Sequence, residues 1–372
     1  METITIAYYA TPHGFGHAVR AIEVIRHLLL ADPAIRVILV SDFPDYLVEE
    51  GLGRLIPFRR RRVDVGLVQK DSLRFDLDAT LVELMKLHRE SEVLTREEMH
   101  FFQSRGVQAI VSDVSYLPFV AASAYGIPSI GIGNFTWDWI YEAYAGIDSR
   151  WLPVVEWIRE CYGKSDLFLQ LPMHGDVSVC PRVEPVPLIA RRAARDRETV
   201  RKILGCGPKT RAYMIYFVAL DLSAEAQRRI ESFEKGIFFY KRPLSLDLAN
   251  GRSLDGFDLS FVEAVAAMDG IITKPGYGIV SDCLVHGIPM IYTDRGHFPE
   301  VEILVEAMKR HLATVHLPSE EFASGRWEAA IERLGTLSHP SDGVRSDGAA
   351  VCAQRIIELV RAKQGTRSRG LP

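Results

Sequence analysis

The segment of the sequence with the clearest chemical potential follows the first predicted strand. Residues 11–20 read T-P-H-G-F-G-H-A-V-R and lead into a predicted helix. Gly14 and Gly16 permit a tight turn and a close approach of the backbone to a ligand, and a helix start offers unpaired N–H groups to an anion. The segment therefore predicts an anion site at the start of this helix.

His17 lies in the first turn of the same predicted helix. An imidazole is suited to take a proton from a hydroxyl nucleophile. Asp113 follows the predicted strand 109–112, so it would lie at the same sheet edge and orient the ring. The alternatives are that His17 caps the backbone or packs against the loop, and that Asp113 caps a helix beginning near Tyr116. We interpret the two residues as a base and its orienting acid.

Other chemistries find less support in the sequence. The glycine segment lacks the third glycine of a dinucleotide-binding fingerprint, and no acid stands at a convincing ribose position. No histidine and carboxylate residues have metal-ligand spacing, and no D-x-D triplet suggests a metal-held diphosphate. We therefore expect neither a metal nor a cofactor.

A run of polar and aromatic residues follows the predicted strand 129–133. We expect Asn134, Trp137 and Asp138 to face an acceptor, with the aromatic ring as a stacking platform for a sugar. Packing between helices would give a similar pattern. The four arginines at positions 59–62 predict a solvated strand edge, with binding of an acceptor phosphate as the alternative.

The elements that must position these residues alternate between strands and helices. Apolar runs at 4–10, 36–41, 109–112, 129–133 and 167–171 predict a parallel sheet with both faces covered. The alternation restarts after a proline-rich stretch, with predicted strands at 212–219, 236–240, 271–273 and 290–293. We predict two facing Rossmann-like α/β domains with a ligand cleft between them and a C-terminal helix. The predicted boundaries are 1–180, a linker at 181–195, a second domain at 196–345, and a helix and tail at 346–372.

Composition narrows the class of protein further. The 372 residues include 44 basic and 48 acidic side chains, a net charge of −4 that does not favour binding to nucleic acid. The five cysteines form no C-x-x-C pair, which fits a cytoplasmic protein. No apolar run reaches the length of a membrane span, whereas peripheral contact with a membrane stays open. The oligomeric state is not predicted.

Several longer stretches resemble a known family. H-G-F-G-H-A-V-R, the stretch 63–76, the stretch 112–141 with N-F-T-W-D-W, and K-P-G-Y-G-I-V-S-D-C-L-V-H-G-I-P at 274–289 are similar to the glycosyltransferase-like N-terminal region of L-arabinokinases. Arabinokinases carry a sugar kinase domain after this region, and its G-L-S-S-S-A-type loop is absent here. The resemblance implies a GT-B fold and no kinase activity.

The C-terminal half is also similar to the donor domain of GT-B enzymes, through A-M-D-G-I-I-T-K-P-G-Y-G at 267–278. The resemblance implies a donor site for the diphosphate, ribose and sugar. Its residues would be Lys274, the turn Gly276, Tyr277 and Gly278, the nearby Ser281, the ribose acid Asp282, and Arg295 and Glu300 for phosphate and sugar. That family usually has Glu in place of Asp282, which here could instead interact with the helix dipole. Arg295 and Glu300 could instead pair at a helix start.

Together, these features predict an inverting, metal-independent glycosyltransferase of the hexosyltransferase type. Its donor would be a nucleotide diphosphate sugar, most simply a UDP-sugar, and its acceptor an unidentified hydroxyl. One alternative is a sugar-nucleotide hydrolase or epimerase of the same fold, because G-F-G-H-A-V-R also resembles the loop of a UDP-sugar hydrolase. A second alternative is a non-catalytic module that binds sugar nucleotides.

Overall fold

The computed structural model describes residues 3–71, 73–338 and 343–369, so the end of the predicted tail lies outside the described residues. The chain forms two compact units, each built around its own sheet. The first unit comprises residues 1–68, 76–190 and 345–372, and the second comprises 69–75 and 191–344. The predicted pair of Rossmann-like α/β domains is confirmed.

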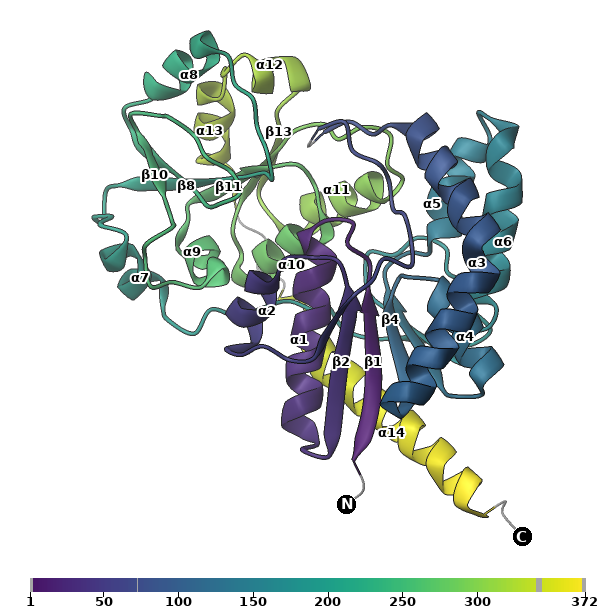
Figure 1. The fold of residues 1–372 in the computed structure, drawn as a ribbon. Helices are drawn as coiled ribbons and strands as arrows, with labels where there is room; N and C mark the ends of the chain where they lie inside the picture. Colours follow the sequence, from purple (N-terminus) through teal and green to yellow (C-terminus); the bar gives the residue numbers. More distant parts are fainter. Residues whose placement is uncertain (1–2, 72, 339–342, 370–372) are drawn as a thin grey trace. The chain divides into compact units, whose positions relative to one another are not determined.

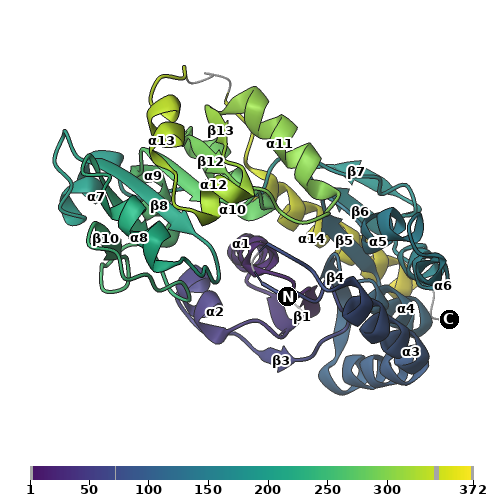
Figure 2. The same ribbon diagram turned by 90° about the horizontal axis from the view of Figure 1, so that it is seen from above.

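The first unit contains a seven-stranded parallel sheet in the order β3-β2-β1-β4-β5-β6-β7 (Figure 2). All seven residues of β1 are buried, as expected for a parallel strand with helices on both sides. The strands are β1 (Ile4–Ala10), β2 (Ile35–Ser41), β3 (Phe58–Arg60), β4 (Val107–Asp113), β5 (Ser129–Gly133), β6 (Leu167–Gln170) and β7 (Val183–Pro185).

Two groups of helices pack with this sheet. One group contains α1 (Phe15–Ala31), α2 (Asp45–Leu52) and α14 (Gly348–Arg369), in which α1 contacts both of the others. The other group contains α3 (Leu77–Arg105), α4 (Leu117–Tyr125), α5 (Trp137–Ala145) and α6 (Leu152–Tyr162), with the 3-10 turn η1 (Ser149–Trp151) before α6. Figure 1 shows α1 and α14 side by side.

The helix α14 completes the first unit although it comes last in the chain. Its side chains Cys352, Ile356 and Val360 are buried. Arg361 pairs with Asp32 at the end of α1, with 2.6 Å between Nη2 and Oδ2. The predicted C-terminal helix is therefore part of the first domain's structure.

The predicted linker at 181–195 needs a correction. Within it, β7 is the edge strand of the first sheet, and the chain passes to the second unit only after Ala190. The prolines of this segment predicted an extended connector, but an edge strand also tolerates proline because one side of it makes no ladder hydrogen bonds.

The second unit contains a six-stranded parallel sheet in the order β10-β9-β8-β11-β12-β13. Its strands are β8 (Arg211–Tyr216), β9 (Gly236–Tyr240), β10 (Gly251–Ser253), β11 (Gly270–Thr273), β12 (Met290–Tyr292) and β13 (Thr314–His316). Its helices are α7 (Arg197–Ile203), α8 (Ala224–Glu231), α9 (Phe261–Ala267), α10 (Tyr277–His286), α11 (Glu300–His311), α12 (Ser319–Ala323) and α13 (Glu328–Leu334).

A short segment from the first half of the sequence belongs to this second unit. Gln69 and Phe75 form an antiparallel bridge, and Leu73 packs against the second unit's buried apolar cluster. The amide of Gly296 donates to the carbonyl of Leu73 at 2.8 Å. This segment, 69–75, is called the inserted hairpin below.

Replacing Ile356 with alanine tests whether α14 stabilises the first unit. We expect a loss of about 2–5 kcal/mol in the free energy of unfolding, because a fully buried side chain is removed from a packed interface. Urea unfolding followed by circular dichroism measures the change. Gln354→Ala, on an exposed position of the same helix, is the control and should change stability by less than about 0.5 kcal/mol.

Candidate active site

The first group of predicted site residues gathers at the carboxyl edge of the first sheet. The helix α1 begins at Phe15, and the preceding Gly14 has φ 86°, which favours glycine. An added Cβ at Gly14 would meet nothing within 4 Å in the described structure. Among the described residues, no side chain caps this helix start, so its first amides remain suited to an anion.

His17 and Asp113 are in direct contact. The distance between His17 Nδ1 and Asp113 Oδ1 is 2.8 Å, and Asp113 is fully buried whereas the His17 side chain retains 12% exposure. An ionised carboxylate only accepts hydrogen bonds, so Nδ1 carries the ring proton and donates a hydrogen bond to Asp113. In the neutral ring Nε2 is then the nitrogen that can accept a proton.

Arg20 completes this cluster and was missed in the sequence. Its Nε and Nη2 donate to the two oxygens of Asp113 at 2.7 and 2.6 Å, and its Nη1 donates to Oδ1 of Asn134 at 3.0 Å. The signal was available, since Arg20 follows His17 by three residues on the same helix and the two therefore share a face. Arg20 is itself only 5% exposed.

The electrostatics of this cluster keep Asp113 ionised. Burial by itself would raise the pKa of the Asp113 carboxyl, but the charge and hydrogen bonds of Arg20, together with the bond from His17, outweigh it and lower the pKa. A permanently charged Asp113 is suited to stabilise a positive charge on His17.

The backbone after Asp113 is strained. Val114 has φ 53°, which is uncommon for a β-branched residue, and its carbonyl accepts from the hydroxyl of Tyr162 at 2.5 Å. An added Cβ on Gly133 would lie 2.5 Å from the Val114 side chain, so glycine is needed there for packing. Strain of this kind often accompanies functional sites.

A second buried acid lies beside this cluster. The oxygens of Asp64 accept from the hydroxyls of Thr11 at 3.0 Å and Ser115 at 2.5 Å. Burial raises the pKa of Asp64, although these two hydrogen bonds lower it in part. The sequence reasoning did not select Asp64 because its partners come from distant segments.

The structure corrects the predicted acceptor platform. Trp137 is fully buried and stacks on Tyr141 with 5.3 Å between ring centroids, so its ring is not open to a sugar. Asn134 is also buried and holds Arg20. Asp138 is 5% exposed and lies 3.5 Å from Nε of Arg159. The open alternative of helix packing therefore describes Trp137, and Asn134 contributes to the site by accepting a hydrogen bond from Arg20.

The second group of predicted residues gathers at the carboxyl edge of the second sheet. Gly276 precedes α10, and an added Cβ there would meet nothing within 4 Å of the described chain. As the N-cap residue, Gly276 offers no side-chain cap to α10. Tyr277 and Gly278 form the first turn, and the hydroxyl of Ser281 donates back to the carbonyl of Tyr277 at 2.7 Å. The Ser281 hydroxyl therefore bonds within its own helix, and its role at the donor stays a prediction.

Asp282 forms an ion pair with the Arg191 guanidinium. The Arg191 amide also donates to Oδ1 of Asp282 at 3.3 Å, and the acid is only 2% exposed. Arg191 already engages the Asp282 carboxylate, and the ribose role of this residue stays a prediction. The sequence did not indicate the pairing because Arg191 lies in the segment interpreted as a linker.

Arg295 and Glu300 lie together near the inserted hairpin. Arg295 Nη1 is 3.9 Å from Glu300 Oε2 and donates to the Pro275 carbonyl at 3.1 Å. The Arg295 guanidinium lies 4.5 Å from the ring centre of Phe298 and 5.6 Å from that of Phe75. The alternative of a pair at a helix start fits Glu300, the first residue of α11.

Lys274 directly follows β11 and has an unusual charge state. The pKa of its ammonium group is lowered to about 7, mainly by burial and also by the charge of Arg295, while the charge of Asp71 in the inserted hairpin acts in the opposite direction. An anion bound beside Lys274 would restore the charged form.

The described residues contain no group of three or more acids, histidines or cysteines that could hold a metal ion. No helix in the described ranges is long and apolar enough to cross a membrane.

Two parallel α/β units, each with a glycine-led helix at the carboxyl edge of its sheet, define the GT-B fold. The glycotransferase of kitacinnamycin superposes with a TM-score of 0.61 at 17% identity, covering 100% of both chains. A UDP-glucosyltransferase from Polygonum tinctorium capable of glucosylating indoxyl superposes with a TM-score of 0.60 at 14% identity, covering 96% of this chain and 99% of the other. The predicted GT-B fold is confirmed.

In sequence, the chain is 29% identical over 347 residues to an L-arabinokinase of Arabidopsis thaliana, which confirms the resemblance inferred above. The match covers 91% of this chain but only 33% of the relative, so the chain spans about a third of that protein's length. An uncharacterized glycosyltransferase of Methanopyrus kandleri is 21% identical over 305 residues, covering 76% of this chain and 86% of the relative. No family model matches the chain.

Replacing Asp113 with asparagine tests the charge cluster. We expect a loss of about 3–5 kcal/mol in the free energy of unfolding at neutral pH, because the buried Arg20 loses its ionised partner. The pKa of Asp113 is lowered by folding, so its contribution is present above the unfolded pKa of about 4 and is lost as the pH falls through the folded value.

Urea unfolding of the wild-type protein and the variant across the acidic range measures the difference between their free energies of unfolding. This difference should shrink below about pH 4. Asp45→Asn is the control, because Asp45 pairs with Arg60 at the surface and should contribute no more than about 1 kcal/mol. If replacing Asp113 lowers the free energy of unfolding no more than replacing Asp45 does, the cluster does not stabilise the fold.

Proposed function

We propose that the protein is an inverting glycosyltransferase that moves a sugar from a nucleotide diphosphate sugar to an acceptor hydroxyl. The observation that carries the proposal is the hydrogen bond from His17 to the buried, ionised Asp113, in a chain with the GT-B fold. We propose UDP as the nucleotide, a choice supported by the UDP-glucosyltransferase among the similar structures.

His17 acts as the general base in this proposal. Its Nε2 takes the proton of the acceptor hydroxyl while that oxygen attacks the anomeric carbon, and the bond from this carbon to the diphosphate breaks. Attack from the opposite side to the leaving group inverts the anomeric configuration. The positive charge that forms on the ring is stabilised by Asp113, which Arg20 holds in place.

The second unit holds the donor in this proposal. The amides at the start of α10 and the cations Lys274 and Arg295 would offset the charge that develops on the leaving diphosphate, without a metal ion. Glu300 would accept hydrogen bonds from the donor sugar.

Replacing His17 with glutamine tests the base. We expect the turnover with UDP-sugars and a pool of acceptors to fall by about 10²–10⁴-fold, because glutamine keeps a polar side chain but does not accept the proton. Release of UDP and formation of the glycoside are both measured. His27→Gln is the matched control, a partly exposed histidine on the same helix that pairs with Glu23, and should leave turnover unchanged.

The same assay separates the alternatives. UDP released at the same rate without any acceptor indicates hydrolysis, and an isomerised donor without a glycoside indicates an epimerase. Tight binding without turnover under any condition indicates a binding module. Undiminished glycoside formation by the His17 variant would remove this residue from the base role.

The pH dependence of donor binding tests Lys274. The ammonium group carries its charge below its pKa of about 7 and loses it above, so an unliganded protein at higher pH must take up a proton to bind a diphosphate. We expect a UDP-sugar to bind about tenfold more weakly at about pH 8 than at about pH 6. Isothermal titration measures both values.

Lys274→Met should abolish that difference and bind weakly at both pH values. Lys235→Met, which removes an exposed lysine of the same unit, should keep the wild-type pH dependence. Equal affinity of the wild-type protein at the two pH values would exclude Lys274 as a phosphate ligand.

A further inference from the structure

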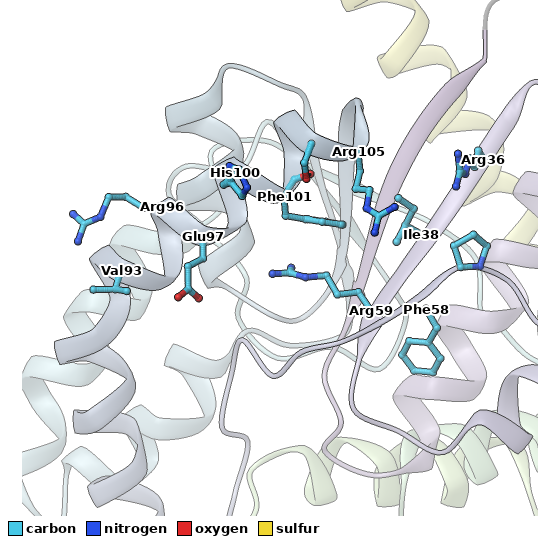
Figure 3. Close-up of a pocket in the computed structure, with 12 residues that line it drawn as sticks. Arg36, Ile38, Phe58, Arg59, Val93, Arg96, Glu97, His100, Phe101 and Arg105 are labelled. Carbon is cyan, nitrogen blue, oxygen red and sulfur yellow. The ribbon is translucent and has the colours of Figure 1, made fainter.

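The first unit contains a cavity that none of the proposed chemistry uses. It has a volume of about 920 Å³ and lies between β2, β3 and α3 (Figure 3). Arg36 on β2 and Val107 at the start of β4 both pair with Thr5, so Arg36 lies near the amino ends of the strands. Asp113 ends β4 at the opposite edge of the sheet. The cavity is therefore separate from the His17 site.

The lining of this cavity is strongly basic. Its lining residues include four arginines and His100, and one acid, Glu97. Glu97 is itself neutralised by Arg61. The charge of the cavity contrasts with the net negative charge of the whole chain, so it is a local feature.

Two of these arginines have no acidic partner among the residues that the structure describes. Arg59 pairs with Glu98 at 2.5 Å, and Arg96 lies 3.9 Å from Glu92. In the ranges that the structure describes, neither Arg36 nor Arg105 forms an ion pair with a carboxylate. They come from different elements, β2 and the end of α3, and line the same cavity (Figure 3). Guanidinium groups in this arrangement suit a phosphate, which accepts several hydrogen bonds at once.

Part of the remaining wall of the cavity is apolar. Ile38, Phe58 and Phe101 line it, and the guanidinium of Arg59 lies 4.2 Å from the ring centre of Phe101. Val93, which is 49% exposed, also belongs to the lining. A ligand that fits both kinds of wall has a charged end and an apolar body.

The apolar wall continues along α3 beyond the cavity. Val82, Met85 and Val93 are 61%, 43% and 49% exposed, which is unusual for large apolar side chains on one helix. They alternate with exposed arginines at helical spacing, so a single face of α3 carries the stripe Val82, Met85, Arg89, Val93, Arg96 and His100. Apolar and basic side chains on one face are typical of contact with a phospholipid surface.

We propose that this cavity binds a phosphate group carried on an apolar body, and that the phosphate headgroup of a membrane lipid is its source. Arg36 and Arg105 bind the phosphate, and the apolar residues of α3 contact the acyl region. No bond is made or broken in this step. It gives the protein a membrane attachment that depends on anionic lipid and on neither nucleotide nor acceptor.

Sedimentation of the full chain with vesicles tests this proposal. We expect binding to phosphatidylcholine vesicles that contain phosphatidylglycerol, weaker binding at high salt, and no binding to phosphatidylcholine alone. The double variant Arg36→Gln, Arg105→Gln should bind about thirtyfold more weakly, since each arginine near an anionic surface contributes about fivefold. Val82→Ser with Val93→Ser should also weaken binding while keeping the charge.

The matched control is Arg228→Gln with Arg333→Gln, which removes the same charge from exposed positions of the second unit and should bind as the wild type does. Thermal unfolding shows whether each variant remains folded.

Titration with decyl phosphate below its micelle concentration distinguishes a membrane lipid from a soluble phosphate ester. If decyl phosphate binds and requires Arg36 and Arg105, but vesicles do not bind, the ligand of the cavity is a soluble phosphate ester. The proposal would be overturned if the protein bound neither anionic vesicles nor decyl phosphate, or if the double variant bound as well as the wild type.

Discussion

The buried carboxylate of Asp113 is the constraint around which the first unit is organised. A charge with no exposure to water is stable only when opposite charge and hydrogen-bond donors surround it, and Arg20 and His17 supply both. These partners come from one face of α1, so α1 must begin at the glycine turn for the cluster to form. Asn134 then fixes Arg20 from the next strand. Stability and the proposed chemistry thus depend on the same few contacts.

The second unit uses a different electrostatic design. Here the cations Lys274 and Arg295 lie close together beside the start of α10, whose N-cap residue is Gly276, and burial lowers the pKa of the lysine. The charges of the Asp113 cluster in the first unit compensate one another, whereas the positive charge of Lys274 and Arg295 in the second unit would be offset by a bound anion. That difference suits one unit to proton transfer and the other to binding a diphosphate.

The sequence predicted the architecture well because strands and helices leave a local periodic pattern. The buried strand at 4–10, the start of α1 and the pairing of His17 with Asp113 followed from that pattern and from the shared edge of a parallel sheet. Asp64 was not predicted, since its hydrogen-bond partners lie far away in the chain, whereas Arg20 was missed although its position on the same helix face as His17 was a usable signal. Trp137 was misinterpreted as an open platform because a buried aromatic ring and an exposed one look alike in sequence.

The path of the chain has a consequence for how the protein is made. The first unit includes the last helix, α14, and the second unit includes the inserted hairpin from the first half of the chain. During synthesis from the amino end, every strand of the first sheet is therefore present long before α14 exists to cover α1. All segments of the second unit are synthesised before α14, because the last residues of this unit precede that helix in the chain. The domain that begins the chain is the one whose structure is completed last.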